Sequence, residues 1–90
     1  MRRCVILIRE HSADIFVGDT KYVAWVCGKK RIDGTWGGWI EFHPVHGAEP
    51  ILRTDQETSQ PNRPALEYWA DGLEPLYLDG ALARAQGRLP

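Results

Sequence analysis

Short apolar runs separated by polar residues and glycines fill the first two thirds of the chain, which predicts that this region is rich in β-strands. The run from Cys4 to Ile8 is rich in β-branched residues and predicts a strand buried on both faces. The polar residues 9–14 predict a turn. Further extended segments are expected at 14–19, 22–27, 35–42 and 51–55.

A hairpin between the segments 22–27 and 35–42 is the clearest supersecondary prediction. Asp33-Gly34 is the dipeptide that a two-residue type I′ turn favours, because both central residues need positive φ. Such a turn pairs Cys27 with Ile40, although a longer turn would shift this register. The two faces would then hold Trp25, Cys27, Trp36, Ile40 and Phe42 on one side, and Lys30, Trp39 and Glu41 on the other.

Gly37 and Gly38 stand side by side in the second strand of this hairpin. Glycine weakens a strand and often marks a bulge or a close backbone approach. The pair therefore favours a sharp bend, as at a barrel corner, over a contact with a ligand.

A helix is predicted over residues 64–71. Pro64 suits the first turn, and Asn62 is a suitable N-cap. Gly72 and Pro75 should end the helix. The apolar stripe at helical spacing is Leu66, Trp69, Ala70 and Leu73.

The remaining C-terminal residues predict a short strand at 76–78, followed by a short helix at 80–86. Asp79 would cap this helix and Gly87 would stop it, with an extended tail as the alternative.

The fold class is therefore α+β: a small bent antiparallel sheet, or a partly open β-barrel, of four to five strands. One main helix lies in the C-terminal half, with the short terminal helix as an optional second. A chain of 90 residues supports one core, so residues 1–90 are expected to form a single domain.

Composition narrows the function classes. Hydrophobic residues make up 43% of the chain and charged residues 26%, which is typical of a globular protein. The formal net charge of −1 argues against general binding to nucleic acid or membranes. No signal-peptide core follows Arg2-Arg3, and no segment reaches transmembrane length, so a cytoplasmic location without a membrane partner is expected.

Cys4 and Cys27 are too few for a disulfide framework, and both lie in apolar stretches. This favours two free, buried cysteines, with a single bridge or a reactive thiol as alternatives. No cofactor is predicted.

A weak metal-site pattern occurs in the loop after residue 42. His43 and His46 could both turn to one ion, and Glu49 could add a carboxylate. Structural zinc sites have four protein ligands, however, and the sequence has no second pair of closely spaced ligands. The sequence therefore favours a solvated loop.

Basic and aromatic residues meet at the predicted hairpin, where Lys29, Lys30 and Arg31 precede Trp36 and Trp39. Single-strand nucleic-acid binders combine such a basic groove with aromatic platforms. Arg2, Arg3 and Arg53 would extend the patch if the strands adjoin. The alternative is that the lysines protect the hairpin end while the tryptophans fill the core.

No hydrolase, metalloprotease or P-loop motif is present, so catalysis is not predicted. The first functional hypothesis is a binding or regulatory module that contacts a protein partner or a second copy of itself. Four tryptophans are an excess in so short a chain, and Tyr68 and Trp69 are adjacent, so one of them, or Trp36 or Trp39, is expected to be partly exposed. Exposed clustered aromatic residues usually indicate a partner. Single-stranded nucleic-acid binding is the second hypothesis, and metal binding or a metal-dependent activity is the third.

Overall fold

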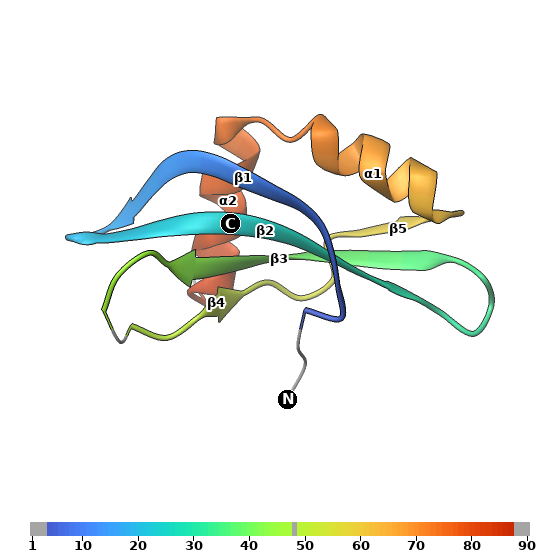
Figure 1. Cartoon of the computed structure of the whole chain (residues 1–90), viewed down its shortest axis with the longest axis horizontal. Helices are drawn as coiled ribbons and strands as arrows, with labels where there is room; N and C mark the ends of the chain where they lie inside the picture. The colour runs from blue at the N-terminus through green and yellow to red at the C-terminus, as the bar shows by residue number, and fades with distance from the viewer. Residues whose placement is uncertain (1–3, 48, 88–90) are drawn as a thin grey trace.

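The computed structural model describes residues 4–47 and 49–87, and it shows an α+β fold (Figure 1). The elements follow in the order β1 (Ile6–Val17), β2 (Thr20–Lys30), β3 (Trp36–Pro44), β4 (Leu52–Arg53), β5 (Thr58–Gln60), α1 (Arg63–Asp71) and α2 (Pro75–Ala85).

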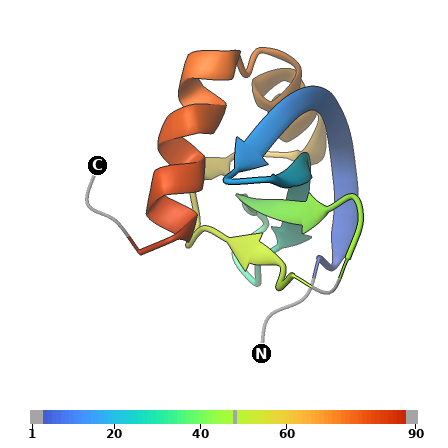
Figure 2. The ribbon, with the colours of Figure 1, turned by 90° about the vertical axis from the view of Figure 1, so that its left-hand side faces the viewer.

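The strands form an antiparallel sheet in the order β1-β2-β3-β4, and β5 pairs with another part of β3. Both helices lie on one side of this curled sheet, and β1 arches around it (Figure 2). The described strands do not close into a barrel, because β1 pairs with β2 alone. The predicted fold class is confirmed in its bent-sheet form.

Strand β1 differs from its prediction in two ways. The polar residues 9–14 continue the strand instead of turning the chain, and register shifts between Leu7 and Arg9 and between His11 and Ile15 absorb their irregular pattern. The predicted run from Cys4 to Ile8 is not buried on both faces, since Val5 is 56% exposed and Leu7 is 45% exposed. An antiparallel sheet can leave one face in solvent, which accounts for the exposed side chains. Register shifts are common at sheet edges, where β1 lies.

The β2–β3 hairpin is predicted correctly in place but not in register. Residues 31–35 form the connection, so Lys30 pairs with Trp36, and Cys27 pairs with Trp39 instead of Ile40. Gly34 takes the positive φ, at 90°. Because side chains alternate along a strand, this shift by one residue exchanges the predicted face partners. Trp39 and Glu41 share a face with Cys27, while Trp36, Ile40 and Phe42 lie on the opposite face.

The hydrophobic core lies between the sheet and the helices. Its sheet side is formed by Ile15, Tyr22, Ala24, Val26, Ile40 and Phe42, and its helix side includes Ala70, Leu78, Ala81 and Leu82.

A pair of glycines lets α1 approach the sheet. A Cβ on Gly28 or on Gly38 would lie 2.7 Å from a methyl carbon of Leu66. No register shift interrupts the β2–β3 pairing there, so the bulge expected at Gly37 and Gly38 is absent. Glycine is needed at position 38 because Leu66 of α1 packs too closely to leave room for a Cβ.

Helix α1 forms as predicted. The Asn62 Oδ1 atom accepts a hydrogen bond from the backbone N–H of Ala65 at 2.9 Å. Leu66 and Ala70 are fully buried, with Trp69 and Leu73 packed beside them.

Helix α2 takes the place of the strand predicted at 76–78 and the helix predicted at 80–86. It begins at Pro75, so residues 76–78 are its first turns instead of a strand, and Asp79 lies inside it instead of capping it. Proline at the first helical position is the sequence signal that explains the earlier start. Neither described helix is both long and apolar enough to cross a membrane.

Candidate functional site

The sheet face opposite the core carries most of the chemically active side chains. The alternation and register of the two central strands place on this face Cys27 and Trp25 of β2 with Trp39, Glu41 and His43 of β3. Lys29 and Gly37 continue the same rows toward the hairpin end. Basic residues therefore gather at one end of this face, and the cysteine with a carboxylate at its middle.

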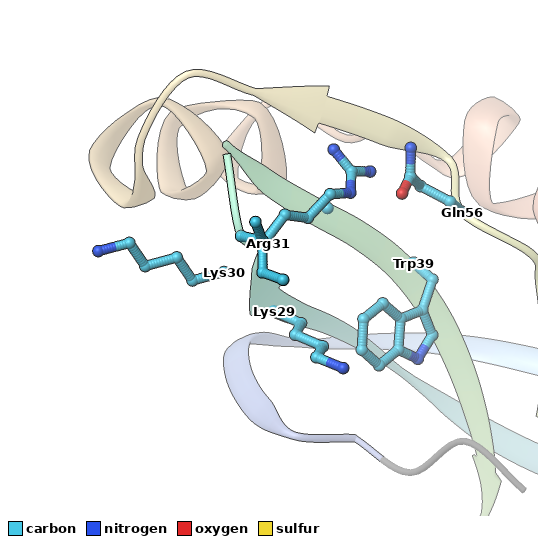
Figure 3. A pocket seen from close by; sticks show the side chains of 7 residues that line it. Lys29, Lys30, Arg31, Trp39 and Gln56 are labelled. Atoms are coloured by element: carbon cyan, nitrogen blue, oxygen red, sulfur yellow. The ribbon is translucent and has the colours of Figure 1, made fainter. Parts of the chain in front are cut away.

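A pocket of about 400 Å³ lies at the hairpin end. Its walls are formed by Lys29, Lys30, Arg31, Ile32, Gly37, Trp39 and Gln56. Figure 3 shows the Lys29 ammonium beside the Trp39 ring, with Arg31 and Gln56 on the opposite side. Three basic residues and no acidic residue line this pocket among the described residues, and the Lys30 side chain points away from Trp39 (Figure 3). Four of the five predicted binding residues thus meet in one place.

Trp36 is the predicted binding residue that does not line the pocket, although Lys30 pairs with it across the hairpin. It lies on the helix face of β3, where the Arg63 guanidinium sits 5.7 Å from its ring centroid. A cation over an aromatic ring is an attractive contact, so Trp36 helps to hold the start of α1. Arg53 also lies outside the pocket, and Arg2 and Arg3 fall outside the described residues.

Arg31 shapes the pocket through its own hydrogen bonds. Its Nη1 atom donates to the Thr35 hydroxyl at 3.0 Å and to the Ser59 hydroxyl at 2.8 Å, which ties the 31–35 loop to β5. Asp33 accepts from the side chain and the backbone of Thr35, and these hydrogen bonds hold the pKa of Asp33 below its ordinary value. The loop is therefore held in one shape beside the pocket.

Trp39 is buried on the sheet face opposite the helices, and it also forms a wall of the pocket. Only 3% of it is exposed, yet its ring borders the pocket. Its indole N–H donates to Glu41 Oε2 at 3.1 Å. This tryptophan is therefore buried, although it lies outside the core between the sheet and the helices.

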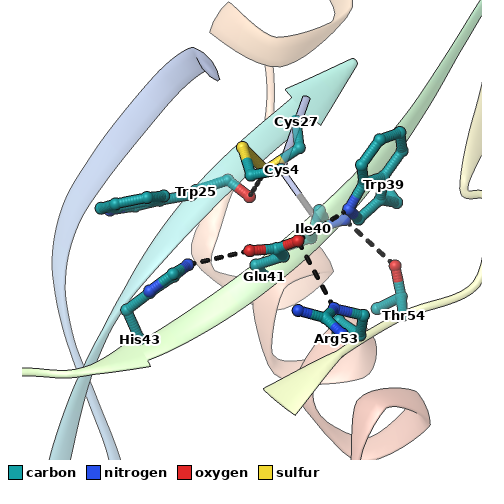
Figure 4. The surroundings of a disulfide bond; sticks show 9 residues. All are labelled: Cys4, Trp25, Cys27, Trp39, Ile40, Glu41, His43, Arg53 and Thr54. Atoms are coloured by element: carbon teal, nitrogen blue, oxygen red, sulfur yellow. Dashed lines mark hydrogen bonds and ion pairs between the residues drawn. A yellow bond between two sulfur atoms is a disulfide. The ribbon is translucent and has the colours of Figure 1, made fainter. Parts of the chain in front are cut away.

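Cys4 and Cys27 form a disulfide, with their Cα atoms 5.2 Å apart (Figure 4). This overturns the preference for two free cysteines. The bridge closes a separation of 23 residues and joins the segment before β1 to the middle of β2. The preference failed because composition gives no sign that the two apolar runs meet.

Glu41 lies beside this disulfide and is only 1% exposed. His43 Nε2 is 2.9 Å from Glu41 Oε1, and Arg53 Nε is 3.4 Å from Oε2. The His43 ring stacks on Trp25, with 3.8 Å between centroids. The carboxylate is therefore surrounded by polar partners (Figure 4), as burial of a charge requires.

The predicted metal ligands do not converge in the described part of the chain. His43 turns toward Glu41, while His46 and Glu49 are exposed in the following loop. The group of possible ligands found among the described residues is instead Cys4, Cys27 and Glu41, with donor atoms within 4.8 Å of one another. Only the correct hairpin register, which sets Cys27 opposite Trp39, would have revealed it from sequence.

A second polar cluster holds α2 to the sheet region. Arg84 donates to both carboxylate oxygens of Glu57, at 3.0 and 2.6 Å, and the Tyr77 hydroxyl donates to Oε1. Burial alone would raise the pKa of Glu57, but the hydrogen bonds from Arg84 and Tyr77 outweigh it and lower that pKa. Burial, together with the Glu57 carboxylate, raises the pKa of Tyr77 to about 12.

Comparisons with protein-family models, with curated proteins and with solved structures found no match to this chain. The functional argument therefore depends on the geometry of the chain itself.

Proposed function

We propose that the protein is a non-catalytic binding module whose hairpin pocket binds single-stranded nucleic acid. The observation that supports this is the convergence of Lys29, Lys30 and Arg31 with Trp39 around one pocket of about 400 Å³. Pockets of this size hold small molecules or single units of a polymer.

Each part of the pocket has a matching part in a nucleotide. Ammonium and guanidinium groups neutralise phosphates, and this term supplies most of the affinity of non-specific binders. The Gln56 amide can both donate and accept hydrogen bonds at a base edge. Ile32 is fully exposed at the rim and offers apolar contact to a base. Since the net charge of the chain is −1, the proposal depends on the basic residues of this pocket and not on the overall charge.

Lys29 is the residue to test first, because its side chain lies beside Trp39 (Figure 3). A labelled oligothymidine would be titrated with the protein at low salt, and fluorescence anisotropy would report binding. Lys29→Gln should weaken binding several-fold, since it removes one phosphate contact. Lys21→Gln is the matched control, because Lys21 pairs with Asp14 far from the pocket.

The expected result is saturable binding by the wild type and by the control, with weaker binding by Lys29→Gln. Equal losses in the two variants would show that only overall charge matters. Absence of saturable binding at low salt would contradict the proposed function itself.

Self-association is a second candidate, favoured by the edge strand β1. This strand has a β partner on one side only, and it carries the exposed apolar residues Leu7 and Phe16, with Val5 just before it. Open apolar strand edges pair readily with another chain. Sedimentation at rising concentration should show a dimer, and Leu7→Lys should shift it toward monomer. A monomer at every concentration would remove this candidate.

A further inference from the structure

The cluster around the disulfide supplies three of the four donors of a tetrahedral zinc site, and a water molecule would take the fourth position. Cys27 and Glu41 project from neighbouring strands onto one face, and Cys4 meets them from the segment before β1. The two sulfurs and one carboxylate oxygen all lie within 4.8 Å of one another. Donors around tetrahedral zinc are about 3.5–4 Å apart, so small movements would bring all three onto one ion.

We propose that, when the disulfide is reduced, Cys4, Cys27 and Glu41 bind one Zn²⁺ ion. Thiolate and carboxylate are both established zinc ligands, and the pair of thiolates selects zinc over magnesium or calcium. None of the three proposed ligands lines the nucleic-acid pocket, although Trp39 lines that pocket and donates a hydrogen bond to Glu41.

A small thiol can act as the reductant of the Cys4–Cys27 disulfide. Two thiol molecules deliver two electrons and two protons to the disulfide, which yields two cysteine thiols and one external disulfide. Zn²⁺ then replaces the two thiol protons, which leave to solvent. Small thiols keep cysteine pairs reduced in the cytosol, so such a compartment would favour the metal form.

Replacing the disulfide by two thiolates and one Zn²⁺ ion leaves the net charge beside the buried Glu41 unchanged. In the oxidised protein, the negative charge of Glu41 is offset by Arg53, whose Nε atom is 3.4 Å from the carboxylate. Two thiolates and one Zn²⁺ together add no net charge. The metal can therefore replace the disulfide without leaving an uncompensated charge in the protein, which would be costly.

His43 is a positioning residue for this site. Its Nε2 atom lies 2.9 Å from Glu41 Oε1, and stacking on Trp25 fixes its ring. Partners of this kind orient metal-binding carboxylates. The carboxylate is thus held in place before any metal arrives.

The test uses Co²⁺ as an optical probe and Zn²⁺ as its competitor. Protein reduced with a phosphine would be desalted without oxygen and titrated with Co²⁺. We expect about one equivalent to bind, with a thiolate-to-cobalt charge-transfer band that Zn²⁺ abolishes. The same protein in its disulfide form is the first control and should show no such band, because it has no thiolates.

Variants then separate the ligands. Cys4→Ser should lose most of the band, and Glu41→Gln should bind at least about tenfold more weakly while circular dichroism shows an intact fold. His46→Ala is the control and should match the wild type, since His46 is exposed outside the cluster. Less than about a tenth of an equivalent in the reduced wild type, or wild-type affinity in Glu41→Gln, would overturn the proposal.

Discussion

At the scale of single residues, Glu57 joins α2 to the sheet through charge. Its side chain is only 8% exposed, and the Arg84 guanidinium donates a hydrogen bond to each of its carboxylate oxygens. Its backbone N–H also donates to the carbonyl of Gly38 at 2.7 Å. Neighbouring side chains and backbone thus hold this residue at both ends.

Replacing Glu57 by Gln should lower the free energy of unfolding by about 2 kcal/mol at pH 7, because a charged hydrogen-bonded pair is lost. The folded-state pKa of Glu57 lies below its unfolded value. Its contribution is therefore complete above the unfolded pKa, and it disappears as pH falls through the folded pKa. Urea unfolding from pH 7 to pH 3 would show the difference between the two proteins shrinking.

Glu67→Gln provides the control for this prediction, because Glu67 makes an exposed pair with Arg63 on α1. Exposed pairs of this type contribute about 0.5 kcal/mol or less. A pH-independent difference between wild type and Glu57→Gln would contradict the assignment of the effect to the carboxylate charge.

Residue-level chemistry was only partly predictable from sequence. The basic and aromatic residues of the hairpin were found because they are close along the chain. The partnership of Cys4 with Cys27 and Glu41 was missed, because it depends on which strands pair and in which register. Contacts between distant segments leave no local signal in a single sequence.

At the scale of elements, α1 docks on the sheet through Leu66, which fits over Gly28 and Gly38. Gly38→Ala would place a Cβ 2.7 Å from Leu66 and 3.0 Å from a methyl carbon of Thr58. Overpacking of this kind should cost about 1–3 kcal/mol, measurable by urea unfolding.

Gly37→Ala is the natural comparison, since Gly37 is the neighbouring glycine on the opposite face. Its Cβ would meet only the ends of the Arg31 and Gln56 side chains, which can move aside. The variant should lose less than about 1 kcal/mol. Equal losses in the two variants would show that α1 does not depend on this close approach.

The elements also show where sequence patterns succeed and fail. Helix α1 was predicted well, because its cap Asn62, its early proline and its apolar stripe agree. The hairpin register was wrong, because the loop over residues 31–35 is longer than the two-residue turn that Asp33-Gly34 favours. Strand β1 was divided in error, since polar residues on an edge strand resemble a turn.

At the scale of the whole molecule, the two faces of the sheet carry different features. One face packs against both helices and forms the core, while the other carries the disulfide cluster and the Lys29, Gly37 and Trp39 part of the basic pocket. The α+β class followed from the order of the predicted elements. The gathering of four binding residues in a pocket required the three-dimensional hairpin, which brings β2 residues beside Trp39 of β3.

The most direct test of the central claim is the salt dependence of oligothymidine binding. Wild type and the Lys29→Gln/Lys30→Gln double variant would be titrated over a range of salt concentrations. Each phosphate contact on a single strand contributes about 0.7 to the slope of log K against log salt. We expect the double variant to lose about 1.4 from the magnitude of this slope. An unchanged slope, or no saturable binding by the wild type at low salt, would contradict a phosphate-binding pocket at the hairpin.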